Sequence, residues 1–356
     1  MSQRAHKALL IATFVLCTII LCVVIPIIFT IRTNDTQYYT VLASGSETTG
    51  PEIIWETKAP GSAVSEENTS TVISMSQNTD DDTSDTAVVH ARIMIVDVGQ
   101  GSCAIIQSGG ETAVFDTGST ATAQVPVRVL KDLGVTEISF CCVTHWDNDH
   151  AGAAIGIFKN FDVKEFLYAD YEADTGTYQS IMSYISEHNM LCRVSSVGEQ
   201  YQIGELTMTI TDPVRYDYEE ENSNSISAVF SYNGIPYVFI GGDTTEESER
   251  DILNAGISVD SVCMICNHHG STTSSCSKFI KAVSPEYTII SCGKDNDYGH
   301  PAASVLKRIH ESGSKLYRTD EQGDIVFFIT DKGVDFELDP TDNWTAGTIK
   351  GGEESE

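Results

Sequence analysis

Four side chains that can bind metal ions crowd into residues 145–150, directly after an apolar run. The segment reads His-Trp-Asp-Asn-Asp-His and offers His145, Asp147, Asp149 and His150 as ligands. Carboxylates this close together repel one another unless a cation neutralises them. The segment therefore predicts a metal site at the end of a strand, in a fold that brings further ligands to the same place.

Other polar side chains also come directly after apolar runs, and they are Asp243, His268, His269, Lys294 and His300. Sheet proteins commonly build a site from residues at strand ends that meet at one edge. A carboxylate such as Asp243 can bridge two ions about 3.5–4 Å apart. We therefore expect a centre with two divalent metal ions.

Strand-like and helical patterns are interleaved between residues 90 and 338. The helical patterns cover Val125–Leu133, Tyr178–His188, Glu246–Leu253, Ser277–Val283 and Ala302–Glu311. Strands dominate the first part, and strands alternate with helices in the last part. This order favours a mixed sandwich with sheets inside and helices outside.

The motifs resemble the metallo-beta-lactamase superfamily, whose signature is His-x-His-x-Asp-His after a strand. The variant with Asp147 at the second histidine is similar to the C-terminal hydrolase-like domain of ComEC-type competence proteins. Further matching segments follow in the expected order, at residues 97–102, 115–118, 222–225, 242–243, 268–271, 298–301 and 317–320. The resemblance implies an α+β fold, the four-layered αβ/βα sandwich.

The resemblance also implies a ligand set for each ion. The first ion would be held by His145, Asp147 and Asp243. The second would be held by Asp149, His150, Asp243 and His269, with His269 favoured over His268. The third-motif histidine of the family has no counterpart here, because Asn224-Ser225 stands in that region. The many oxygen ligands make room for manganese beside zinc.

A water between two dications ionises near neutral pH and can attack a phosphorus or carbonyl centre. Asp149 is the ligand whose loss we expect to abolish turnover. Lys294 and His300 are candidates to contact a phosphate oxygen or to protonate a leaving group. Asp97 and Asp116 are expected to orient the ligands from behind.

The ComEC resemblance implies a nuclease-like phosphodiesterase, and the candidate extracellular substrates are DNA and cell-wall polymers. Residues 91–338 contain 16 Lys and Arg against 36 Asp and Glu, a net charge of −20. Such a domain repels a long polyanion except at the metals, and the chain's net charge of −30 excludes a basic nucleic-acid coat. Two alternatives stay open: a non-catalytic, metal-stabilised surface binding module, and a lactone or thioester hydrolase.

The N-terminal segment contains a candidate membrane anchor. Residues 8–31 carry no charge, and a helix of that length spans about 36 Å. Arg4 and Lys7 precede it, so we expect residues 1–7 in the cytoplasm. The prediction is a single-pass protein of the cell membrane whose hydrolase domain is extracellular. A cleaved secretory signal is the alternative.

The remaining segments differ in composition. Residues 32–89 are rich in Ser, Thr, Asp and Glu and are predicted to form a disordered linker. Residues 90–338 are predicted to form the hydrolase domain, and residues 339–356 a disordered acidic tail. Most of the ten cysteines are interpreted as small core hydrophobes.

Overall fold

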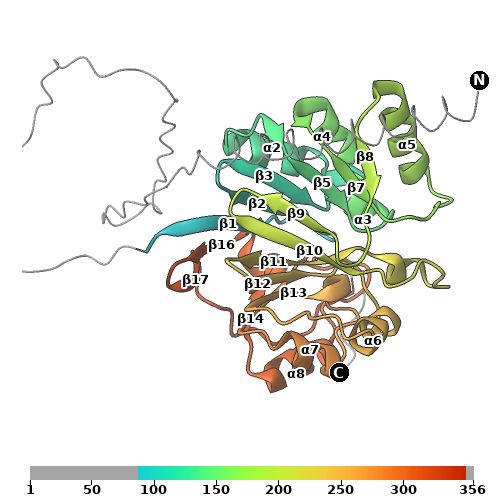
Figure 1. Cartoon of the computed structure of the whole chain (residues 1–356). Helices are drawn as coiled ribbons and strands as arrows, with labels where there is room; N and C mark the ends of the chain where they lie inside the picture. Colours follow the sequence, from blue (N-terminus) through green and yellow to red (C-terminus); the bar gives the residue numbers. More distant parts are fainter. Residues whose placement is uncertain (1–86, 350–356) are drawn as a thin grey trace, which may run out of the picture. The chain divides into compact units, whose positions relative to one another are not determined.

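The structure is a computed structural model that describes residues 87–349 (Figure 1). Its framework is two large β-sheets with helices on their outer faces. The predicted cytoplasmic segment 1–7, the anchor 8–31 and the linker up to residue 86 lie outside the described residues. Between residues 87 and 349, every helix is too short or too polar to cross a membrane.

The first sheet has eight strands in the order β17-β16-β1-β2-β3-β5-β7-β8. Antiparallel pairing joins β17 through β3, and parallel pairing joins β3, β5, β7 and β8. The strands are β1 (Val89–Ile95), β2 (Ala104–Ser108), β3 (Glu111–Phe115), β5 (Phe140–Val143), β7 (Phe166–Tyr168), β8 (Cys192–Val194), β16 (Ile325–Thr330) and β17 (Gly333–Phe336).

The second sheet has seven strands in the order β15-β14-β13-β12-β11-β10-β9. The strands are β9 (Gln200–Ile203), β10 (Leu206–Asp212), β11 (Ser227–Tyr232), β12 (Ile235–Ile240), β13 (Cys263–Ile265), β14 (Tyr287–Ile290) and β15 (Lys315–Arg318). β12 to β15 are parallel, so their carboxyl ends open onto the same edge. A small third sheet pairs β4 (Glu137–Ile138) with β6 (Asp162–Val163).

The five predicted helices are all present, each within two residues of its expected ends. They are α2 (Gln124–Asp132), α5 (Gly176–His188), α6 (Glu246–Asn254), α7 (Ser277–Val283) and α8 (Ala303–Ser312). The structure adds the shorter α3 (Asn148–Ala151), α4 (Ala154–Asn160) and α9 (Thr319–Gln322), and the 3₁₀ turns η1 (Thr120–Thr122), η2 (Glu221–Asn224) and η3 (Asn267–Gly270).

Alternating side chains of the two sheets build three layers of apolar core. Ile93 and Ile95 of β1 face the layer between the sheets, where they join Met208 of β10. The intervening Met94 faces a second layer, under α2, α4 and α5. A third layer lies between the second sheet and α6, α7 and α8. Since a strand alternates its side chains between two faces, this pattern yields the expected αβ/βα sandwich.

The cysteines within residues 87–349 all have free thiols, and most are buried. Cys142 packs between the sheets, and its neighbour Cys141 packs under the helices of the first sheet. Cys263 and Cys266 are buried around β13. The interpretation of these residues as small core hydrophobes is confirmed.

Residues 339–349, predicted to begin a disordered tail, instead pack against the domain. The Arg318 guanidinium donates to two backbone carbonyls of this segment, at 2.6 and 3.2 Å. Trp344 packs against the core layer under α8. The Gly347 N–H donates to the Pro301 carbonyl at 2.9 Å. Composition concealed this order because backbone carbonyls, present at every residue, hold the segment in place.

Candidate metal centre

Side chains from both sheets converge at one edge of the sandwich. His145 follows β5, and His150 lies on α3 just beyond it. Asp243 follows β12, and His268 and His269 lie on η3 after β13. These strands all end at the same edge, so the predicted gathering of ligands occurs there.

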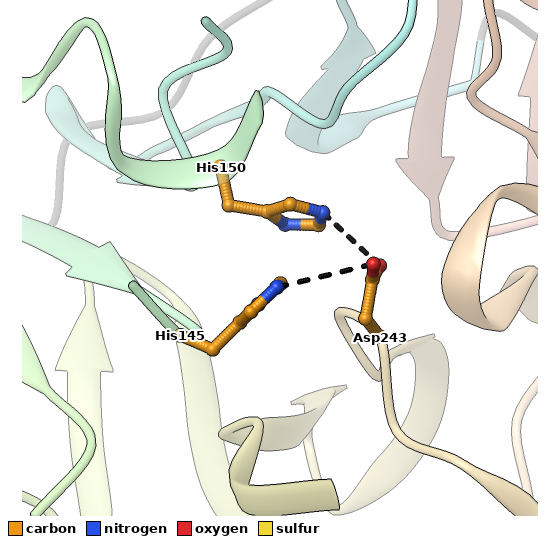
Figure 2. A group of neighbouring side chains, drawn as sticks. All are labelled: His145, His150 and Asp243. Carbon is orange, nitrogen blue, oxygen red and sulfur yellow. Dashed lines mark ion pairs between the residues drawn. The ribbon is translucent and has the colours of Figure 1, made fainter. Parts of the chain in front are cut away.

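The Asp243 carboxylate lies at the middle of the site, and the rings of His145 and His150 point toward it (Figure 2). Its Oδ1 is 3.0 Å from His150 Nε2 and 3.5 Å from His269 Nε2. Its Oδ2 is 3.9 Å from His145 Nε2 and 3.5 Å from His268 Nε2. Each oxygen thus faces a different pair of imidazoles, which is the arrangement that a bridge between two ions requires.

One set of atoms has the spacing of ligands around a single ion. His150 Nε2 lies 3.1 Å from His269 Nε2, which lies 3.4 Å from Asp149 Oδ2. Ligand atoms 2.0–2.1 Å from a tetrahedral ion are about 3.3–3.4 Å apart. Asp149, His150 and His269 form one compact group of potential ligands, and His145, His150 and Asp243 form another.

Hydrogen bonds fix which nitrogen of the two central histidines carries the proton. His150 Nδ1 donates to Asp116 Oδ2 at 2.7 Å, and His269 Nδ1 donates to the Ser291 carbonyl at 2.8 Å. Both acceptors lack a hydrogen of their own. The Nε2 atoms therefore present lone pairs to the site, as metal-bound histidines do.

His145 is oriented in the same way. The Thr144 hydroxyl donates to Asp116 at 3.0 Å, which leaves its oxygen free to accept from His145 Nδ1 at 3.1 Å. His145 Nε2 is buried and has no hydrogen-bond partner, and the same is true of Asp243 Oδ1. Buried polar atoms without partners are costly, and a divalent cation would satisfy both. The residues present therefore fit a metal centre.

The charges at the site respond to one another. Burial opposes ionisation of Asp243, yet His150 and His269 hold the pKa of its carboxyl well below the usual range. Burial also opposes protonation of His150, but Asp243 and Asp116 outweigh it and raise its pKa well above normal. Metal binding requires the neutral imidazole, so a metal ion would compete with protonation of His150.

The predicted ligands outside the two compact groups lie at the margin of the site. Asp147, at the N-terminus of α3, is partly exposed, and its Oδ2 is 3.6 Å from His145 Nε2. His268 faces the Oδ2 side of Asp243, and burial lowers its pKa. The structure therefore brings all seven predicted ligands together, with His269 deeper than His268.

The two other predicted catalytic residues differ in position. His300 is buried, and its ring stacks on that of His269 at 6.4 Å. Burial, followed by His269 and His268, lowers the pKa of His300 to about 4, and its Nδ1 has no partner. Lys294 is exposed on the turn after β14, and the hydrogen bonds and ion pairs described for residues 87–349 do not include its side chain.

Of the two acids expected to orient ligands, one does so. Asp116 is fully buried and contacts His150, as expected. The expectation for Asp97 is wrong: it is exposed, and it accepts a hydrogen bond from the Gly99 N–H in the turn after β1. An Asp side chain often accepts a hydrogen bond from the N–H two residues later in a turn. The position of Asp97 beside a glycine-rich turn therefore did not indicate a role at the metal centre.

Sequence reasoning missed the support of the loop that carries His268 and His269. Glu249 of α6 is fully buried and accepts hydrogen bonds from the Asn267 side chain and from the N–H groups of Ser275 and Cys276. Arg308 of α8 donates to the carbonyls of residues 274 and 275. A glutamate on the buried face of an otherwise amphipathic helix was the available signal.

The backbone of this loop is itself unusual. His268, His269 and Gly270 all have positive φ, at 51°, 54° and 78°. Non-glycine residues adopt this left-handed conformation at a cost, and such residues are enriched at functional sites. A Cβ at Gly270 would lie 2.8 Å from the Pro301 Cβ, so glycine is needed there.

Comparison with known proteins agrees with this geometry. Residues 96–294 match the family model of the metallo-beta-lactamase superfamily. The chain is 24% identical over 251 residues to ComE operon protein 3 of Bacillus subtilis (strain 168), covering 65% of this chain and 32% of that protein. It is 28% identical over 247 residues to competence protein ComA of Neisseria gonorrhoeae, covering 68% and 33%. The chain thus spans about a third of the length of these relatives.

A solved structure aligns with this chain at low similarity. The metallo-beta-lactamase fold protein YhfI from Bacillus subtilis aligns with a TM-score of 0.44 and 12% identity, over 64% of this chain and 95% of that one. The family match covers more than half of the chain, in the region that holds the converging ligands. This chain belongs to the metallo-beta-lactamase superfamily, and its hydrolase-like domain is homologous to ComEC-type competence proteins.

Proposed function

We propose that this protein is a metal-dependent phosphodiesterase of the nuclease type. The observation that carries the proposal is Asp243, whose two carboxylate oxygens face separate pairs of histidine Nε2 atoms. Two divalent ions, zinc or manganese, would supply Lewis acidity and a water activated near neutral pH. His145, Asp147 and Asp243 would hold the first, and Asp149, His150, Asp243 and His269 the second.

The protein's own residues would prepare the site for that chemistry. Asp116 and the Ser291 carbonyl hold His150 and His269 with their lone pairs turned inward. His300 has a pKa of about 4, so it is neutral at physiological pH. A neutral imidazole suits a hydrogen bond to a phosphate oxygen better than protonation of a leaving group, which requires a pKa nearer the working pH.

The likeness to competence proteins supports a nucleic acid as the phosphodiester. The acidic domain restricts how such a substrate can bind, because a net charge of −20 over residues 91–338 repels a polyanion away from the ions. The uncharged segment 8–31 supports attachment to the cell membrane, with the hydrolase domain on the extracellular side. Protease treatment of intact cells would test that orientation.

Activity and metal content of the full-length protein test the proposal. We expect tightly bound zinc or manganese and hydrolysis of bis-p-nitrophenyl phosphate. Asp149→Ala should lower kcat/KM by at least a hundredfold, since Asp149 contacts His269 within the deeper ligand group. Asp335→Ala, which truncates an exposed acid on β17, should have no effect.

The same experiment separates the alternatives. Bound metal without turnover of any ester or phosphodiester would identify a binding module instead. Turnover of lactones or thioesters, with phosphodiesters left intact, would identify a different hydrolase. Protein that holds no metal and hydrolyses the phosphodiester regardless would contradict the metal centre itself.

A further inference from the structure

A large aromatic side chain is exposed beside the metal centre. Tyr298 is 66% exposed, on the turn between β14 and α8. Its ring stacks on His300 with a centroid distance of 5.5 Å and an interplanar angle of 20°. His300 in turn stacks on His269 at 6.4 Å and 25°. Three nearly parallel rings therefore lead from the surface to a proposed metal ligand.

The turn that presents Tyr298 is held by a buried side chain. Asn296 Oδ1 accepts hydrogen bonds from the Tyr298 and His300 N–H groups, both at 3.0 Å. Asn296 Nδ2 donates to the carbonyls of His300 and Gly293. The backbone that carries the exposed ring is thus held in place, so a ligand that uses the ring need not order the turn.

The acids of the site also affect the pKa of the Tyr298 phenol. Burial raises the pKa of Tyr298, and Asp149 and Asp147 raise it further. The ring is therefore uncharged at physiological pH. An uncharged aromatic face near a phosphodiester-cleaving centre suits a flat, uncharged group attached to the phosphate.

Lysine and arginine side chains do not pair with the acids of the site. Within residues 87–349, the ion pairs of Asp147, Asp149 and Asp243 are all with histidines. The ions and the exposed Lys294 would each hold a phosphate, and in a domain with a net charge of −20 over residues 91–338 a contact that does not depend on charge would add to them. Proteins that bind single strands use stacking of bases on aromatic rings for this purpose.

We propose that the outer face of Tyr298 stacks a base of single-stranded nucleic acid, next to the phosphodiester at the metal centre. The inference rests on the proposed function and adds a substrate class to it. A base in a duplex is covered on both faces by its neighbours, so a single strand is preferred. A cell-wall polymer of sugar or polyol phosphates has no flat base to place on the ring.

Steady-state kinetics of the full-length protein test the stack. The substrates are a single-stranded oligonucleotide and the same strand with one abasic site beside the cleaved bond. For Tyr298→Ala we expect KM on the intact strand to rise by a factor about ten times larger than the factor by which kcat falls. Both constants of Tyr298→Phe should stay close to those of the wild type. The abasic site should raise KM of the wild type by a similar factor and add little in Tyr298→Ala.

Leu191→Ala is the control, because it truncates another exposed apolar side chain, between α5 and β8. Equal loss on intact and abasic strands, or preference for duplex or for a polyol-phosphate polymer, would overturn the inference. If bis-p-nitrophenyl phosphate is hydrolysed and Tyr298→Ala does not change the kinetics on oligonucleotide strands, only the inference fails.

If no phosphodiester is hydrolysed, the proposed function fails. Quenching of a 2-aminopurine strand, lost in Tyr298→Ala, then decides the stack by binding alone.

Discussion

Asp116 orients both histidines of the segment 145–150 through one buried carboxylate. It accepts directly from His150, and it reaches His145 through the Thr144 hydroxyl. Groups that hold metal ligands from behind fix the tautomer and the direction of the lone pair. A single residue on the first sheet therefore sets the geometry of two ligands.

Asp212 is a second buried acid, and it lies outside the metal centre. Its carboxyl accepts from the Ser248 hydroxyl and the Val214 N–H, both at 2.8 Å. Burial raises its pKa to about 8. The folded protein therefore keeps a proton at Asp212 that the unfolded chain releases above about pH 4.

We predict that this proton makes the domain less stable as pH rises. Between pH 5 and 7.5 the folded state binds more protons at Asp212 than the unfolded state, so the free energy of unfolding falls by roughly 1 kcal/mol per pH unit from this group. Asp212→Asn should remove that slope, which urea unfolding at several pH values would measure. Asp335→Asn, at an exposed site, should leave the slope unchanged.

At this scale, the gathering of the ligands could be predicted because the ligands of residues 145–150 are close in sequence. His145, Asp147, Asp149 and His150 lie within one turn, so their spacing alone predicted a cation. The acceptor for His269 is the Ser291 carbonyl, 22 residues away. Every residue has such a carbonyl, so no pattern of side chains could have identified it.

Among the elements, the loop 267–276 is held by opposite charges from two helices. Glu249 on α6 accepts hydrogen bonds from N–H groups of the loop, and Arg308 on α8 donates hydrogen bonds to its carbonyls. The loop supplies His268 and His269, whose left-handed conformation needs such restraint. The helices outside the second sheet thus position ligands as well as cover the core.

We predict that Glu249→Gln weakens metal binding at the deeper ligand group. The variant keeps the shape of the side chain but turns an amide donor toward N–H donors, and an unpaired buried donor costs about 1–3 kcal/mol. We expect at least a tenfold loss of affinity, measured by titration with Co²⁺ and its visible absorbance. Glu246→Gln, on the exposed side of α6, is the matched control. Unchanged affinity for Co²⁺ in a folded Glu249→Gln protein would show that the loop keeps its shape without the hydrogen bonds to the Glu249 carboxylate.

The predicted helices followed from periodicity, but the hydrogen bonds of Glu249 to the loop 267–276 did not. Glu249 lies 18 residues from Asn267 and 26 from Ser275, with no repeat that links them. A buried glutamate departs from the usual pattern of a surface helix. A buried charged residue on a helix therefore indicates a role in tertiary structure, but the sequence does not identify the residues that it contacts.

For the whole domain, the metal centre joins the two sheets. His145 and His150 belong to the first half of the sandwich, and Asp243 and His269 belong to the second. A bound ion would therefore stabilise the packing of one half on the other. Ligands that bind only the folded state raise its stability according to their concentration.

We predict that chelation lowers the melting temperature. A hundredfold excess of free ion over its Kd is worth about 2.7 kcal/mol, which corresponds to roughly 5–10 °C for a domain of this size. Differential scanning calorimetry before and after EDTA, with readdition of zinc or manganese, measures the shift. A protein whose melting temperature ignores both treatments would have no ion joining its halves.

The segment 339–349 has a practical consequence for handling the protein. Gly347 is fixed beside the His300–Pro301 peptide, at the turn that carries Tyr298. A fusion joined directly after residue 349 would start near the turn that carries Tyr298, and a polyhistidine tag there would compete for the very ions under study. Purification is better served by an N-terminal handle, or by anion exchange that exploits the acidic surface.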